Sequence, residues 1–297
     1  MTGTQAPSCA APLVRGANTA AARSATGRAG SATTRFGYRP AVDGRTTVRP
    51  PALIAVAHGS RDARSAATVS AVVAAVAAAR PDLDVRLAFL DLNAPSVEQV
   101  VDAVAAQGHT DAVVSPLLLG SAFHARVDLP GLLGTARARH PRLRLVQADV
   151  LGADPRLVAA LRDRALTACG TGEAVHPSAN CRLGIAVAAV GSSSPTANAR
   201  TAVVAGRLAT LTGWRTELCF ATTGPSVTEA MSRLQAHGAD RVLVAPWFLA
   251  PGLLTDRLVR AAPQAIHADV LGPHPALTDV ILDRYHAAIA EPPALSA

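Results

Sequence analysis

The 297-residue sequence contains no lysine, so all 28 of its basic residues are arginine. A Walker P-loop needs a lysine that contacts the nucleotide phosphates, and Schiff-base catalysis needs a lysine amine. The absence of lysine therefore excludes both kinds of chemistry from this chain, including ATP-driven mechanisms of the P-loop type.

Aromatic residues and cysteines are also scarce. Only nine residues are aromatic although 49% are hydrophobic, so alanine, valine and leucine must fill the core. Few aromatic side chains leave few platforms on which bases could stack, which disfavours stacking-based nucleic-acid binding. The four cysteines (Cys9, Cys169, Cys181 and Cys219) are too scattered for a disulfide framework, and we expect a cytoplasmic protein.

Long apolar runs are absent as well. The longest strictly apolar run, Ala71–Ala79, is about half the length that a membrane-spanning helix needs. No apolar stretch follows the first charges in the way that a secretory signal requires. We therefore expect neither a membrane span nor a membrane partner.

The formal net charge of +7 is concentrated near the N-terminus. Residues 1–50 contain seven arginines and one acidic residue, which leaves 21 arginines against 20 acids in the rest of the chain. This Ala-, Thr-, Gly- and Ser-rich segment cannot bury enough apolar surface to offset the entropy of ordering, so we predict a disordered basic tail. An organellar transit peptide or an over-long start-site assignment fits the same composition. The hypothesis that the chain binds nucleic acid is supported by this charge alone, and we expect no nucleic-acid partner.

From residue 51 onward, short apolar runs alternate with longer amphipathic segments. Strands are expected at 52–57, 85–90, 112–117 and 143–147, and helices at 62–79, 95–107, 129–140 and 155–168. Short strands that alternate with longer helices are typical of βαβ units and a parallel sheet. Residues 169–182 lack periodicity and predict a linker.

The same order of elements begins again after the linker, with strands expected near 183–190, 215–220, 241–246 and 265–270. Sequence features recur with it: Pro95-Ser96-Val97 and Pro225-Ser226-Val227, Gly108 and Gly238, Pro116 and Pro246, Val150-Leu151-Gly152 and Val270-Leu271-Gly272. These repeats indicate a duplication. We predict an α/β protein with an N-terminal lobe over 51–168 and a C-terminal lobe over 183–291, each a parallel four-stranded sheet flanked by helices.

Potential metal ligands and proton acceptors follow three strands of the first lobe. His58 follows the first strand, Asp91 follows the second, and His124 lies in the segment after the third. Ligands of open α/β sheets bind outside the carboxyl ends of the strands. Two imidazoles and a carboxylate can hold a divalent transition metal and accept protons near neutral pH. A histidine after a strand can equally serve as a cap or a hydrogen-bonding residue.

The C-terminal lobe lacks both histidines. Val190-Gly191-Ser192 stands where the first lobe has His58-Gly59-Ser60, and Leu254 stands opposite His124. The structural glycines and prolines remain in both lobes, so the fold does not need the histidines. We therefore predict one active site per chain, in the N-terminal lobe, with the C-terminal lobe closing the cleft.

Three motifs in this order resemble the sirohydrochlorin chelatase family, which comprises class II, ATP-independent tetrapyrrole chelatases. They are Ala57-His58-Gly59-Ser60-Arg61-Asp62, Phe89-Leu90-Asp91 followed by Pro95-Ser96, and Gly-x-x-x-His-x-x-x-Asp-hydrophobic-Pro over residues 120–130. The resemblance is strong over about 52–168 and weak over 183–290, as in the duplicated long form of the family. It implies two chelatase-like lobes and a metal chelatase, a lyase that inserts a divalent metal into sirohydrochlorin.

The resemblance also implies roles for individual residues. His58 and His124 would bind the metal and assist pyrrole deprotonation, and Asp91 stands where the family usually has a glutamate. We predict all three as catalytic. Guanidinium groups bind carboxylates bidentately, and the substrate implied by the resemblance carries eight carboxylates. Substrate-binding residues are therefore predicted beside the motif histidines: Ser60, Arg61, Arg64, Ser121 and Arg126.

We expect no cofactor beyond the divalent metal substrate, and we favour Fe2+ over Co2+ as that metal. The expected partners are a tetrapyrrole and a metal ion. The chain is expected to be a monomer whose two lobes form an internal pseudo-dimer. The alternatives are a cobaltochelatase of cobalamin biosynthesis and a non-catalytic metal- or tetrapyrrole-binding protein. A metal or Fe–S role for Cys169, His176 and Cys181 in the linker is an open alternative, and their spacing matches no standard site. His109 and His237, in helix-to-strand turns, are expected at the surface.

Overall fold

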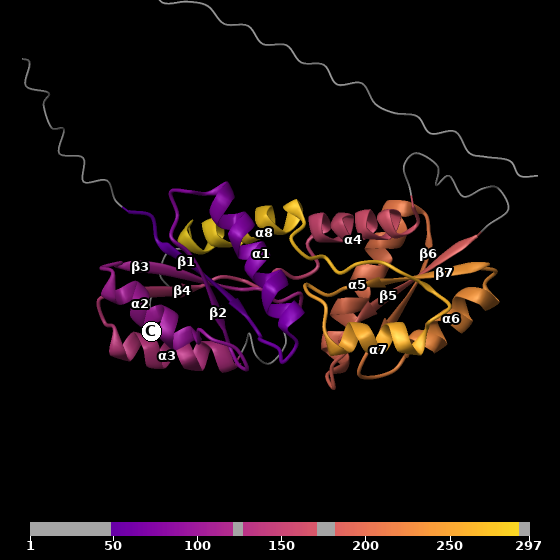
Figure 1. Cartoon of the computed structure of the whole chain (residues 1–297), viewed down its shortest axis with the longest axis horizontal. Helices are drawn as coiled ribbons and strands as arrows, with labels where there is room; N and C mark the ends of the chain where they lie inside the picture. Colours follow the sequence, from indigo (N-terminus) through magenta and orange to yellow (C-terminus); the bar gives the residue numbers. More distant parts are fainter. Residues whose placement is uncertain (1–48, 121–126, 171–181, 291–297) are drawn as a thin grey trace, which may run out of the picture. The chain divides into compact units, whose positions relative to one another are not determined.

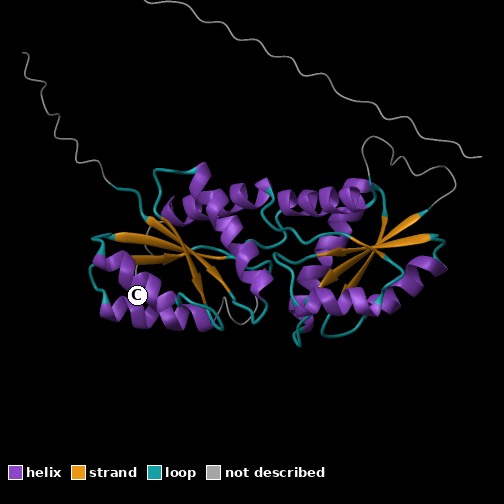
Figure 2. Cartoon of the chain, in the orientation of Figure 1, coloured by secondary structure: helices purple, strands orange, loops and turns teal. Residues whose placement is uncertain are grey.

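A computed structural model describes residues 49–120, 127–170 and 182–290, in which strands and helices alternate twice over (Figures 1 and 2). The first half contains β1 (Ala52–Ala57), α1 (Ala63–Ala79), β2 (Val85–Phe89), α2 (Val97–Ala106), β3 (Asp111–Pro116), α3 (Leu129–Arg139), β4 (Arg144–Gln147) and α4 (Pro155–Ala168). The second half contains β5 (Leu183–Ala189), α5 (Pro195–Thr212), β6 (Arg215–Phe220), α6 (Val227–Ala236), β7 (Arg241–Pro246), α7 (Leu253–Ala261), β8 (Ile266–His267) and α8 (Pro275–Ala290).

Each half forms a four-stranded sheet in which every pairing is parallel. The strand order is β2-β1-β3-β4 in the first sheet and β6-β5-β7-β8 in the second. The predicted α/β class with two parallel sheets is confirmed. The last strand of the second sheet has two residues, so it is shorter than the segment expected near 265–270. Residues 1–48 of the predicted tail and 171–181 of the predicted linker lie outside the described residues.

The repeated Pro-Ser-Val sequence marks the start of the same helix in each half. Ser96 Oγ accepts the backbone N–H of Gln99, and the Gln99 side chain accepts the Ser96 N–H in return. Ser226 and Glu229 form the same reciprocal pair at the start of α6. Such capping boxes satisfy backbone donors that a helix N-terminus leaves without intrahelical partners.

The last helix of each half packs against the sheet of the other half. Helix α8 lies on β3, β4 and α1 of the first half, whereas α4 contacts β7, β8 and α5 of the second (Figure 1). One buried hydrophobic cluster consequently includes Leu53 and Val113 from the first sheet together with Leu243 from the second and Ile281 from α8. The two halves share a core, a feature that the sequence repeat did not predict.

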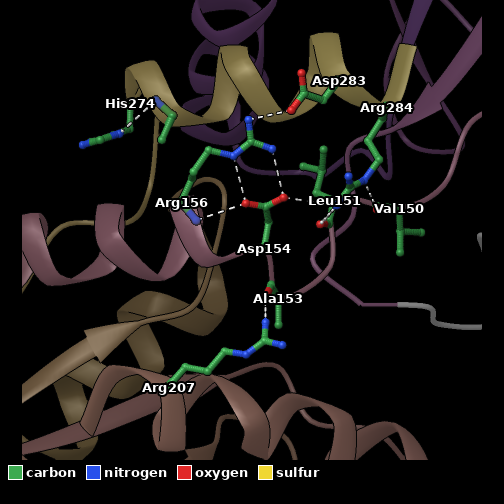
Figure 3. A network of polar contacts seen from close by, with 10 residues as sticks. Val150, Leu151, Ala153, Asp154, Arg156, Arg207, His274, Asp283 and Arg284 are labelled. Carbon is green, nitrogen blue, oxygen red and sulfur yellow. Dashed lines mark hydrogen bonds and ion pairs between the residues drawn. The ribbon is translucent and has the colours of Figure 1, made fainter. Parts of the chain in front are cut away.

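Arginines on the exchanged helices bind loops of the opposite half. Arg284 on α8 donates to the carbonyl oxygens of Val150 and Leu151, 3.1 and 3.2 Å away, and Arg164 on α4 donates to that of Leu271 at 2.7 Å (Figure 3 shows the Arg284 side). The loop residues Leu151 and Leu271 correspond in the repeat. The contacts between the halves therefore follow the duplication.

A buried carboxylate strengthens the Arg284 side of this junction. The side chain of Asp154 is 8% exposed and accepts from Arg156 at 3.0 Å and from Arg284 at 3.3 Å (Figure 3). The hydrogen bond from Arg156 holds the pKa of Asp154 below its usual value. Arg156 in turn bonds Asp283 of α8 at 2.6 Å, and Arg207 of α5 donates to the carbonyl oxygen of Ala153. Charged groups of both halves thus converge on one loop.

The expectation for His109 was wrong, because its side chain is only 2% exposed. Its Nε2 lies 2.8 Å from Asp84 Oδ2, and Arg86 bonds the same carboxylate. Burial alone would raise the pKa of Asp84, but the hydrogen bonds from Arg86 and His109 outweigh burial and hold that pKa below its usual value. His237, in the corresponding turn of the second half, is exposed as expected.

The side chain of Ser115 on β3 is fully buried, and its hydroxyl finds no hydrogen-bond partner within the described residues. A buried hydroxyl without a partner destabilises the fold, so Ser115→Ala should raise the free energy of unfolding by about 1 kcal/mol. The repeat supplies the matched control, since Ala245 occupies the same place on β7 and is equally buried. Ala245→Ser should lower stability in urea unfolding, and a loss of stability in Ser115→Ala would contradict the assignment.

In the described ranges, no helix combines the length and the apolar character that crossing a membrane requires.

Candidate active site

His58 and Asp91 lie side by side where β1 and β2 end. Backbone hydrogen bonding between these two strands continues beyond their last residues. Leu90 N–H donates to the Ala57 carbonyl at 2.9 Å, and Asp91 N–H donates to the His58 carbonyl at 3.0 Å. Both residues therefore stand at the carboxyl edge of the first sheet, the edge at which parallel α/β sheets bind ligands. The structure brings these two sequence-predicted residues together.

Gly59 allows the two strand ends to approach so closely. Its φ of +98° is in the left-handed region that favours glycine. A Cβ atom at this position would lie 1.8 Å from the carbonyl oxygen of Asp91, well inside van der Waals contact. Glycine is thus required both for the backbone conformation and for the approach of the Asp91 backbone.

Local backbone groups orient both side chains. His58 Nδ1 lies 3.3 Å from the Gly59 carbonyl oxygen, a contact that favours a proton on Nδ1 and a lone pair on Nε2. Leu92 N–H donates to Asp91 Oδ1 at 2.7 Å, which fixes the carboxylate against its own turn. The pair therefore offers an imidazole and a carboxylate in defined orientations.

A pocket of about 540 Å³ opens at this edge. It is lined by His58, Leu90, Asp91, Val127, Asp128, Gly131 and Leu132. Among the described residues of the lining, Leu90, Val127 and Leu132 are apolar, and the polar groups are one imidazole and two carboxylates. Asp128, which precedes α3, lies in the third sequence motif but was not among the predicted site residues.

Ser60 and Arg64, two other predicted residues near His58 in the sequence, have hydrogen-bond partners within the chain. Ser60 Oγ accepts the Asp62 N–H at 3.1 Å, and Arg61 is exposed. The Arg64 guanidinium bonds Asp62 and, across the halves, Asp256, both at 2.6 Å. The hydrogen bond from Arg64 lowers the pKa of Asp62. The predicted site residues Ser121, His124 and Arg126 lie outside the described residues.

The second half has the same backbone arrangement with different side chains. Thr222 N–H donates to the Val190 carbonyl at 3.0 Å, the counterpart of the bond from Asp91 to His58. Gly191, with a φ of +90°, matches Gly59. Val190 and Thr222 thus stand where the first half has His58 and Asp91. At these two positions the backbone geometry is duplicated, but only the first half has an imidazole and a carboxylate.

Within the described residues, no three His, Cys, Asp or Glu side chains are close enough together to hold a metal ion. His176 and Cys181 of the predicted linker fall outside this part of the chain. Cys219 is buried, and burial raises the pKa of its thiol to about 12, so it is a poor metal ligand at neutral pH. The pair of His58 and Asp91 remains the candidate for chemistry.

The fold and site define a duplicated α/β protein whose first half carries an imidazole and carboxylates at its sheet edge. The CbiX family model matches residues 52–168 and 184–288, and the chain belongs to this family. Both halves are matched, which agrees with the duplication inferred from the sequence.

Known relatives of this chain include tetrapyrrole chelatases. The sirohydrochlorin ferrochelatase of Bacillus subtilis (strain 168) is 26% identical over 242 residues, covering 78% of this chain and 90% of the relative. The sirohydrochlorin cobaltochelatase of Priestia megaterium is 27% identical over 211 residues, covering 67% and 68% of the two chains. The structure of SirB from Bacillus subtilis with Fe3+ superposes with a TM-score of 0.68 at 26% identity over 81% of this chain and 96% of that one. The resemblance to the sirohydrochlorin chelatases is confirmed.

Proposed function

We propose that this chain is a sirohydrochlorin chelatase, which inserts a divalent metal ion into sirohydrochlorin without nucleotide. The observation that carries the proposal is the pair of His58 and Asp91 on adjacent strand ends. The second half has the same backbone arrangement, but Val190 and Thr222 occupy these two positions. The relatives named sirohydrochlorin ferrochelatase and cobaltochelatase support the same reaction.

The reaction requires groups that hold a metal ion and accept protons. Metal insertion removes two pyrrole N–H protons and replaces the water ligands of the ion. The His58 imidazole can bind a transition metal or accept a proton from the substrate, and the Asp91 carboxylate offers oxygen atoms for either role. We assign His124 the role of a second imidazole ligand, as its motif implies. No nucleotide energy is needed when the metallated product is the more stable state.

Asp91 is one methylene shorter than the glutamate usual in the family. Its backbone is bonded to that of His58, and both residues line the same pocket. A shorter carboxylate at this position therefore still faces the space that His58 faces. We propose that Asp91 acts with His58 in deprotonation of the macrocycle.

Arginines in or next to the sequence motifs are the proposed binding groups for the substrate carboxylates. Arg61 is exposed beside His58, and Arg126 and the serines Ser60 and Ser121 belong to the same motifs. Arg64 already bonds Asp62 and Asp256, so a substrate carboxylate would have to replace one of these partners. We therefore propose Arg61 and Arg126 as the stronger contributors.

We propose Fe2+ as the preferred metal and Co2+ as the alternative. The ferrochelatase of Bacillus subtilis is matched over 78% of this chain, whereas the cobaltochelatase of Priestia megaterium is matched over 67% of it and two archaeal cobaltochelatases over 39% and 40%. Imidazole and carboxylate ligands accept both ions, so the assay must include both. We further propose that the chain acts as a monomer, since its two halves share one core.

The test is absorbance-monitored metallation of sirohydrochlorin with Fe2+ and with Co2+. Loss of a positioned acid–base group costs roughly 100-fold or more, so His58→Ala should slow metallation by at least that factor, and the double variant with His124→Ala further. His237→Ala, at an exposed position of the second half, is the matched control and should retain the wild-type rate.

Equal rates for the double variant and the wild type would refute the site assignment. Stoichiometric binding of metal or tetrapyrrole without acceleration over the spontaneous reaction would instead identify a non-catalytic carrier.

A further inference from the structure

The turn after Asp91 contains an unusual backbone conformation. Leu92 has a φ of +63°, and it is the only non-glycine residue with positive φ in the described ranges. Asn93 N–H donates to the Asp91 carbonyl at 2.8 Å, so the turn closes over a single residue. This bond and the positive φ are those of a γ-turn of the rare, strained kind. Leu92 is 50% exposed, so burial of its side chain does not explain the conformation.

The strained turn directs the side chain of Asn93 toward the loop that carries His58. Asn93 Oδ1 accepts the backbone N–H of Ser60 at 2.7 Å. The same oxygen lies 3.2 Å from the Cβ position of Gly59, so this side chain packs directly on the loop. One amide group thus connects the residue two positions after His58 with the residue two positions after Asp91.

The second half satisfies the same backbone donor without strain. Ser192, the counterpart of Ser60, donates its N–H to Asn198 Oδ1 of α5 at 2.8 Å. The turn after Thr222 is one residue shorter than the turn after Asp91, and no residue in it is among those with positive φ. Fold stability therefore needs an acceptor for this N–H but does not need it to come from the second turn.

From this contrast we infer that Asn93 is a positioning residue that fixes the His58 loop relative to Asp91. Local strain persists where the surrounding structure demands it, and it concentrates at functional sites. Here the strained residue Leu92 places the Asn93 amide against the loop that follows His58, so this amide joins that loop to the turn after Asp91. Of the two halves, only the one with His58 and Asp91 has this arrangement. The positioning role of Asn93 rests on the proposed function, because that function assigns metal binding and proton transfer to His58 and Asp91.

The test compares Asn93→Ala with Asn198→Ala, which removes the corresponding bond in the second half. Co2+ is titrated into each full-length apoprotein and followed by its visible absorption, and Fe2+ metallation of sirohydrochlorin gives kcat and KM. Loss of residues that orient metal ligands typically weakens binding 10- to 100-fold. We expect Asn93→Ala to weaken Co2+ binding at least tenfold and to lower kcat more than it raises KM, with both variants showing similar Tm values.

Asn93→Asp retains an acceptor for the Ser60 N–H and should restore Co2+ binding to at least one third of the wild-type affinity. Wild-type Co2+ affinity in Asn93→Ala, or an equal loss in Asn198→Ala, would overturn the inference, as would a wild-type protein that binds no Co2+. A wild type that binds Co2+ but does not metallate sirohydrochlorin would refute the proposed function, and the ratio of the Co2+ affinities would still decide the role of Asn93.

Discussion

Gly59→Ala is expected to abolish metallation and to lower the free energy of unfolding by roughly 3 kcal/mol or more. The new Cβ would lie 1.8 Å from the Asp91 carbonyl oxygen, and the φ of +98° disfavours any side chain. The position of the Cβ is set by its own backbone, and the oxygen that it meets is a backbone carbonyl, so no rotamer change relieves the contact. The strand ends must separate, which breaks the bond from the Asp91 N–H to the His58 carbonyl.

Gly108→Ala is the matched control for this variant. Gly108 has a φ of +79°, but a Cβ there would meet no atom within 4 Å. It should therefore cost about 1 kcal/mol from backbone strain alone and leave metallation at the wild-type rate. Urea unfolding and the metallation assay measure both quantities. Equal stabilities for the two variants, or wild-type activity in Gly59→Ala, would show that the two strand ends are not held as described.

The sequence was sufficient to predict the sheet edge at which His58 and Asp91 meet. Short apolar strands that alternate with helices define parallel sheets, and parallel strands bring their carboxyl ends to one edge. Residues that directly follow β1 and β2 must then lie near each other. The repeat added a second argument, because the second half retains Gly191 but has Val190 in place of the imidazole.

The partner of the last helix in each half was not predictable in the same way. Helices α4 and α8 both follow the fourth strand of their own half and both have an apolar face. An amphipathic pattern shows that a helix is buried on one side, but it does not show which of two similar sheets buries it. The exchange is decided by packing between segments far apart in the sequence.

The conformation and burial of single residues in turns were also not predictable from the sequence. The role that we propose for Asn93 depends on the positive φ of Leu92, and a leucine in the sequence does not predict that conformation. His109 was expected in an exposed turn, but its side chain is buried and pairs with the carboxylate of Asp84, 25 residues earlier. In both cases the decisive partner comes from another loop.

The helix exchange predicts that Tyr285→Ala destabilises both halves together, by about 3–5 kcal/mol. Tyr285 on α8 is 1% exposed, and its hydroxyl donates to the Pro51 carbonyl at 2.7 Å, beside β1. Removing the ring leaves a cavity between a helix of the second half and the sheet of the first. Because the two halves share one hydrophobic cluster, that loss should propagate to the second sheet.

The tryptophans make this coupling measurable. Trp214 and Trp247 are the only tryptophans of the chain, and both belong to the second half. Their fluorescence in Tyr285→Ala should change at the same reduced urea concentration as the far-ultraviolet circular dichroism of the whole chain. Two separated transitions, with the fluorescence transition at its wild-type position, would mean that the halves unfold independently.

Tyr285→Phe separates the hydroxyl from the ring. This variant keeps the packing and loses one hydrogen bond, so it should cost about 1 kcal/mol near neutral pH. Burial raises the pKa of Tyr285 from 10.0 to about 12, so the folded state retains the phenolic proton at pH values where the unfolded chain releases it. The wild type should therefore lose stability as the pH rises from 10 to 12, relative to Tyr285→Phe, which has no proton to release at this position. A constant difference between the two proteins over this range would show that the hydroxyl is not buried against Pro51.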